Sequence, residues 1–255
     1  MTLWSLLQVL LFGYPPAPEM IDSRFPEFLQ RVGGLSLTLT LTALSLLFGV
    51  ALGCLLALCR RESFGNASAS GNAPAARLAL RGLNLAAAAL VETVRGLPVM
   101  ILALLVFYLP YPLTGLRFPG VILAVAAFSL YAAAYFSELV RAGFRSVPPG
   151  LREAGRVLGI PSVRIFLKVE LPLVTRNMMP DIVNLAVTVF KDTSVLAVAA
   201  VAELTFTARQ AFMSQPMDYS LVLLLTMFLY WAPAALVSSF LTARGDGRTA
   251  FRFSR

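Results

Sequence analysis

The sequence predicts an all-α polytopic membrane protein with about five transmembrane helices, and three observations lead to this prediction. Of the 255 residues, 58% are hydrophobic and only 13% are charged, whereas a soluble domain carries about 25% charged residues. The apolar residues gather in runs long enough to cross a bilayer, and Lys and Arg gather between these runs. Because lipid offers the backbone no hydrogen-bonding partner, each crossing segment must be a helix.

The five predicted spans lie at about 32–59, 82–110, 118–144, 175–202 and 219–243. Each exceeds the roughly 20 residues that a helix needs to cross the hydrocarbon core. The first and the last carry no charged residue. The spans make a transmembrane domain of residues 32–243, preceded by an N-terminal interfacial or periplasmic segment (1–31) and followed by a cytoplasmic tail (244–255).

The distribution of basic residues predicts the orientation of the spans. If the N-terminus lies outside, fifteen of the 21 Lys and Arg residues fall on the cytoplasmic side and four outside, namely Arg24, Arg31, Arg117 and Arg209. Cytoplasmic loops are enriched in Lys and Arg, so the 145–172 loop and the C-terminus are predicted to be cytoplasmic. An even number of spans would remove this asymmetry. The net charge of +8 therefore reflects membrane topology and does not indicate nucleic acid binding.

The segments outside the spans and the rarity of metal-binding residue types further limit the possible functions. Residues 1–12 are apolar but too short to span, and they lack the basic start and small-residue cleavage site of a signal peptide, so we expect an interfacial helix. Residues 62–76, rich in Gly, Ser, Asn and Ala, predict a flexible cytoplasmic connector. The chain has no His, and Cys54 and Cys59 lack metal-ligand partners. A zinc or His-based catalytic site is therefore disfavoured, and both thiols are expected to pack.

The loop between the third and fourth spans, residues 145–172, has apolar residues at helical spacing with basic residues between them. Gly159 is suited to end a first short helix, and Pro161-Ser162 to start a second with Ser162 as its N-cap. The helices could lie on the inner leaflet or dock a soluble partner. The chain lacks the phosphate-binding pattern G-x-x-x-x-G-K-[ST]. Any use of ATP therefore needs another chain, which favours docking.

Three motifs add a family resemblance. They are E-T-V-R-G-L-P at 92–98, E-A-G-x-x-x-G at 153–159 and K-D-T-S at 191–194. Over about residues 33–242 the chain resembles permease subunits of bacterial ATP-binding-cassette (ABC) importers. The second motif has the spacing of their cytoplasmic EAA loop, and the other two point to the polar amino acid uptake family. Gly155 replaces the second Ala of the EAA pattern, and the connector at 62–80 is longer than in that family.

This resemblance implies a transport subunit of the bacterial inner membrane that is not an enzyme and binds no cofactor itself. ATP and Mg would be used by two ABC ATPase subunits. The other implied partners are a second permease protomer, identical or related, and a periplasmic or lipid-anchored substrate-binding protein. The coupling helix would sit in a groove of an ATPase subunit, and the predicted coupling residues are Arg152, Glu153, Ala154, Gly155, Arg156 and Gly159. Since Gly costs roughly 1 kcal/mol of helix stability relative to Ala, Gly155 is expected to weaken this helix.

Charged residues inside the spans are candidates for the substrate pathway, because charge in a bilayer is costly and usually faces a bundle interior or an aqueous path. Lys191 and Asp192 lie near the middle of the apolar stretch 182–202. They could pair with Glu92 or Glu138 of other spans, or face an amino acid substrate. Glu92 and Arg95 can pair along one helix face, and a kink is expected at Gly96-Leu97-Pro98. The candidate pathway residues are Arg95, Gly96, Pro98, Lys191, Asp192, Thr193, Ser194 and Glu203, the last facing the outer vestibule.

Two other functions compete with that of a transport subunit. A stand-alone secondary transporter or channel would usually need more spans or an inverted repeat. An intramembrane enzyme is remote, because the chain has neither a His nor a G-x-S-x-G or H-E-x-x-H motif. Five spans do not readily enclose a polar pathway, so two protomers are expected to pair.

Overall fold

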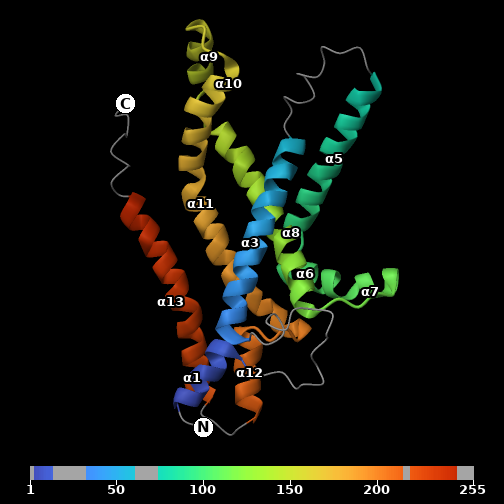
Figure 1. Ribbon diagram of the computed structural model, residues 1–255, viewed down its shortest axis with the longest axis vertical. Coiled ribbons are helices and arrows are strands. Elements are labelled where there is room, and N and C mark those ends of the chain that lie inside the picture. Colours follow the sequence, from blue (N-terminus) through green and yellow to red (C-terminus); the bar gives the residue numbers. More distant parts are fainter. Residues whose placement is uncertain (1–2, 14–32, 61–73, 215–218, 246–255) are drawn as a thin grey trace. The chain divides into compact units, whose positions relative to one another are not determined.

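The computed structural model describes residues 3–13, 33–60, 74–214 and 219–245 (Figure 1). Three predicted features lie partly outside these residues: the N-terminal segment at 14–31, the connector at 62–73 and the tail at 246–255. The described residues are almost entirely helical, with one isolated parallel bridge between Gly34 and Glu203.

The helices of the described residues are α1 (Leu3–Phe12), α3 (Gly34–Cys59), α5 (Pro74–Gly96), α6 (Val99–Tyr108), α7 (Pro110–Thr114), α8 (Gly120–Arg145), α9 (Pro149–Val157), α10 (Ser162–Ile165), α11 (Leu171–Asp192), α12 (Leu204–Ser214) and α13 (Tyr219–Gly245). A π-helical turn, Phe166–Glu170, joins α10 to α11, and a 3-10 helix, Thr193–Ala199, follows α11. In the described residues four helical segments are long and apolar enough to cross a membrane, and α5 with α6 makes a fifth if the two are one broken span. The predicted fold class is confirmed.

The second span is interrupted where the sequence predicts a kink. Helix α5 ends at Gly96 and α6 begins at Val99. Pro98 is the N-cap of α6 with an extended backbone (φ −57°, ψ 135°), because proline has no N–H to continue the ladder and pushes the residue before it away from the helical region. The span is thus two helices, not one kinked helix over 82–110.

The fourth span also differs from its predicted form. Instead of a short helix in the loop and a separate span over 175–202, one helical segment runs from Ser162 to Ala199 through the π-helical turn. Pro161 occupies the N-cap position and Ser162 is the first helical residue, so the predicted Ser162 cap is wrong. The segment ends where Ala200 takes a left-handed conformation (φ 57°).

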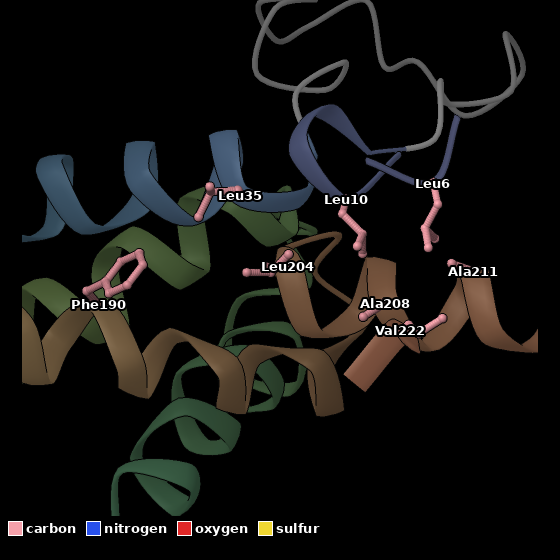
Figure 2. Close-up of a cluster of buried hydrophobic side chains, with 8 residues drawn as sticks. All are labelled: Leu6, Leu10, Leu35, Phe190, Leu204, Ala208, Ala211 and Val222. Carbon is pink, nitrogen blue, oxygen red and sulfur yellow. The ribbon is translucent and has the colours of Figure 1, made fainter. Parts of the chain in front are cut away.

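The chain divides into two compact units. Unit 1 comprises Met1–Leu47, Pro98–Ser129 and Ala186–Arg255, and unit 2 comprises Phe48–Leu97 and Leu130–Leu185. In unit 1, apolar side chains from α1, α3, α11, α12 and α13 form one buried cluster (Figure 2). Leu6 and Leu10 of α1 are completely buried in it. The apolar helix α1 therefore packs on α12 within this unit.

Small residues allow the helices of unit 2 to approach closely. A side chain added at Gly53 of α3 would meet the carbonyl oxygen of Ala133 in α8 at 2.8 Å, and one at Gly143 of α8 would meet Met178 of α11 at 2.6 Å. Helices in lipid associate mainly through such close packing, because lipid removes the hydrophobic driving force between them. These contacts hold α8 between α3 and α11 within the unit.

Candidate coupling loop and buried polar sites

Helix α9 has one buried position and several exposed ones. Gly155 is buried, whereas Glu153, Ala154 and Arg156 are exposed. Beyond them, Val157 and Leu158 are 87% and 75% exposed, so the helix ends in an apolar tip. Gly159 then takes a left-handed conformation (φ 71°), which glycine adopts without steric cost and which turns the chain sharply toward α10.

Gly155 has a packing role that the sequence did not indicate. An added Cβ would lie 2.7 Å from Cδ1 and 3.0 Å from Cγ1 of Ile165. The buried Ile165 side chain thus occupies the space that an alanine methyl would need. The predicted cost of Gly155 in helix stability stays a prediction, and the structure adds that its missing side chain brings α9 against α10.

Arg152 extends from α9 to the π-helical turn and forms a two-pronged ion pair with Glu170. Its Nε donates to Oε1 at 2.6 Å and its Nη2 donates to Oε2 at 2.8 Å. The Glu170 side chain is 4% exposed and that of Arg152 45%. The hydrogen bonds to this carboxylate raise the pKa of Arg152 above its usual range. Arg152 therefore ties α9 to the π-helical turn, while its predicted role in coupling stays a prediction.

A second charged cluster lies where α3, α5 and α8 meet in unit 2. Glu138 of α8 accepts from Arg60, which directly follows α3, and from Nε of Arg141 at 3.0 Å, and Arg95 of α5 lies 3.8 Å away. Nη2 of Arg60 also lies 3.5 Å from Oε1 of Glu92. The side chains of Arg60 and Glu138 are 10% and 13% exposed. Glu138 is thus surrounded by arginines, as a carboxylate in an apolar region requires.

Glu203 forms a buried polar site in unit 1. Its carboxylate accepts from the backbone N–H groups of Thr205 and Phe206, both at 2.9 Å, and from the Tyr230 hydroxyl at 2.8 Å. Glu203 lies beyond Ala199, where the fourth span ends, and it is fully buried. Burial raises its pKa from 4.5 to about 7, although these hydrogen bonds act in the opposite direction. The carboxylate caps α12 and ties it to α13.

Comparison with known proteins identifies the kind of protein that carries these sites. The family model of the inner membrane component of binding-protein-dependent transport systems matches residues 73–249. The chain belongs to this family. The L-cystine transport system permease protein TcyB of Bacillus subtilis (strain 168) is 32% identical to the permease over 233 residues, which cover 91% of each protein. The glutamine transport system permease protein GlnP of Escherichia coli (strain K12) is 30% identical over 182 residues, 71% of the permease and 76% of GlnP.

Solved structures agree with this membership. The crystal structure of an amino acid ABC transporter with histidines matches the permease with a TM-score of 0.68 and 25% identity, over 81% of the permease and 88% of that chain. The permease is therefore a multi-pass inner membrane transport component and not an enzyme. The stand-alone transporter or channel is not favoured.

The structure places the candidate pathway residues of the permease at the ends of helices. Arg95, Gly96 and Pro98 lie at the break between α5 and α6. Lys191 and Asp192 end α11, and the 3-10 helix begins with Thr193 and Ser194, so the charged pair is not in the middle of an α-helix. The Thr193 hydroxyl donates to the Phe190 carbonyl at 2.7 Å. That bond keeps Thr193 within the helix end.

Two predictions for individual residues of the permease are wrong. Glu92 and Arg95 do not pair with each other, because each lies near a residue of another helix, Arg60 and Glu138 respectively. Glu203 is fully buried instead of facing a vestibule.

Sequence reasoning missed three residues that organise the permease. Arg60 directly follows the uncharged first span. A long arginine side chain at such a position can reach along the span to a charged partner on another helix, and this is the signal that could have found it. Glu170 is one of only two acidic residues in a basic loop, the other being Glu153, which is a signal for an internal ion pair. Tyr230 carries no comparable signal, because a tyrosine in a long apolar helix is equally suited to face lipid.

Proposed function

We propose that the permease translocates polar amino acids, or solutes that resemble them, across the bacterial inner membrane by alternating access driven by separate ATPase subunits. Two kinds of observation support this proposal. Similar proteins are named for transport of cystine and glutamine, and α9 ends in the exposed apolar residues Val157 and Leu158. An exposed apolar tip beside Glu153 and Arg156 suits docking in a groove of a soluble partner. The proposed coupling role rests on this one observation, the exposed apolar residues Val157 and Leu158 at the end of α9.

The proposal includes the other members of the complex. Two ATPase subunits would hydrolyse ATP with Mg, a substrate-binding protein would deliver the amino acid, and a second permease protomer, identical or related, would complete the pathway. The excess of Lys and Arg in the 145–172 loop and the tail supports an outer N-terminus and a cytoplasmic C-terminus. Arg95 and the 191–194 motif remain candidates for contact with substrate. The helices end or break at these residues, and a helix that ends or breaks inside a membrane offers unpaired backbone groups to a ligand.

Uptake by the purified complex tests this function. The permease, its genetically neighbouring ATPase and its binding protein are reconstituted in proteoliposomes with radiolabelled cystine, glutamine or arginine. We expect uptake of at least one amino acid that needs ATP inside and the binding protein outside. Equal uptake by the permease alone, without ATP, would contradict the proposal and support a channel or secondary transporter.

A charge at the tip of α9 tests the docking surface. Leu158→Glu should leave the permease folded, because the side chain is 75% exposed. It should reduce co-purification of the ATPase and uptake by more than tenfold, since a buried unpaired carboxylate in an interface costs several kcal/mol. Leu113→Glu on α7 is the matched control, because Leu113 is 72% exposed and lies in a predicted external loop. Normal ATPase binding and uptake by Leu158→Glu would exclude this docking surface.

A further inference from the structure

We propose that Arg152 and Glu170 form a clamp that makes α9 and the start of the fourth span one rigid lever, so that motion of α9 is transmitted directly to α11. The clamp consists of these two side chains only. The inference rests on the proposed docking of α9 on an ATPase subunit. It gives Arg152 the role of a positioning residue, which acts through Glu170 and not through contact with the partner.

The geometry of the pair is that of a rigid connection. Two parallel hydrogen bonds, at 2.6 and 2.8 Å, fix both the distance and the rotation of the guanidinium relative to the carboxylate. Lysine would keep the charge but would lose this orientation, because its ammonium group is a point charge on a flexible chain. Glu170 is buried, so its own side chain is held by its surroundings.

The clamp bridges the turn that would otherwise be the flexible point of the loop. Between α9 and α10 the chain turns at Gly159, which has a left-handed conformation. A Cβ added to Gly159 would have no other atom within 4 Å, so no packing contact supports the turn at this residue. The contact of Gly155 with Ile165 joins the two sides of this turn, and so does the ion pair of Arg152 with Glu170, which lies about one helical turn earlier along α9. Two separated contacts prevent α9 from pivoting about either of them alone.

The base of the clamp is attached to α8 as well as to α11. Phe166, at the start of the π-helical turn, stacks on Phe144 of α8 with ring centroids 5.8 Å apart and planes 8° from parallel. Asn177 of α11 donates to the Ser146 hydroxyl at 3.0 Å. A π-helical turn is rare and often occurs at functional sites, and here it carries Glu170 as its last residue. A push on α9 would therefore reach both spans that flank the loop.

The coupling ratio of the reconstituted complex tests the clamp. Uptake and ATP hydrolysis are measured together for Arg152→Gln, Arg152→Lys, Glu170→Gln and the exchange Arg152→Glu with Glu170→Arg. We expect Arg152→Gln and Glu170→Gln to raise the number of ATP molecules hydrolysed per amino acid at least fivefold while the ATPase still co-purifies. Arg152→Lys should lie between these and the wild type, and the exchange should restore part of the ratio. Arg164→Glu, an exposed change on α10, is the control with an unaltered ratio.

A distance measurement keeps the inference testable if Glu170 variants fold poorly. Cys54 and Cys59 are replaced by Ser, and nitroxide labels are placed at the exposed positions Val157 and Thr175. We expect a narrow distance distribution with Arg152 present and a clearly broader one in Arg152→Gln. A wild-type ratio and an unchanged distribution in Arg152→Gln would overturn the clamp. Failure of the ATPase to bind the wild-type permease would instead overturn the proposed docking, and the two failures are thus distinguishable.

Discussion

Replacing Gly34 with alanine is expected to destabilise the permease more than an alanine at any other glycine of the described residues. Gly34 takes a left-handed conformation (φ 58°), and an added Cβ would overlap the carbonyl oxygen of Leu10 and lie 3.1 Å from the backbone nitrogen of Gly13. The atoms it meets belong to the backbone and cannot rotate away. A left-handed non-glycine residue costs about 1–3 kcal/mol before any clash. We expect a loss of roughly 3 kcal/mol or more.

The measurement is thermal unfolding of the purified permease in detergent, followed by circular dichroism at 222 nm. A loss of this size lowers the midpoint by roughly 10 °C in a chain of this length. Gly82→Ala is the matched control, because Gly82 lies inside α5 with no atom within 4 Å of an added Cβ, and alanine should gain up to about 1 kcal/mol of helix propensity there. Equal midpoints for the two variants would disprove the steric role of Gly34.

Glu203→Ala is the second change with a large expected effect. It removes the acceptor of two backbone N–H groups, at Thr205 and Phe206, and of the Tyr230 hydroxyl. Each buried donor that is left without a partner costs about 1–3 kcal/mol, so we expect a loss of roughly 3 kcal/mol, mainly from the two backbone N–H groups, because the Tyr230 hydroxyl keeps the Thr205 hydroxyl as a partner. Tyr230→Phe removes one of the three donors and should cost about 1 kcal/mol. The same thermal unfolding assay ranks the variants, and Glu203→Ala with a wild-type midpoint would refute this role.

The pH dependence of Glu203→Gln gives an independent check. The pKa of Glu203 is raised from 4.5 to about 7 in the folded protein. At pH values between these two pKa values, the carboxyl group is therefore mostly protonated in the folded state and mostly ionised in the unfolded chain. The contribution of Glu203 to stability therefore falls as the pH rises through this window and is constant above it, whereas glutamine does not titrate. We expect the midpoint of the wild type minus that of Glu203→Gln to decrease between pH 5 and pH 8. A constant difference would show that Glu203 keeps an ordinary pKa.

Features that depend on residues near one another in sequence were predicted well. The apolar runs, the break at Gly96-Leu97-Pro98 and the turn at Gly159 follow from hydrophobicity and from backbone rules that act within a few residues. Pairing of side chains was predicted poorly. Glu92 and Arg95 are near enough to pair on one helix, yet Arg60 and Glu138 from other helices are near them instead. Periodicity indicates which face of a helix is apolar but not which helix covers it.

The sequence by itself determined the class of the protein: a chain this apolar, with its basic residues gathered between apolar runs, must be a helical membrane protein. Its motifs also indicated the importer family and the candidate coupling loop. Only the tertiary structure decided what individual residues of that loop do. Gly155 admits Ile165, and Arg152 binds Glu170, 18 positions away. The physical reason is that burial and ion pairing depend on distances between helices, and these are set by packing, which local sequence patterns do not encode.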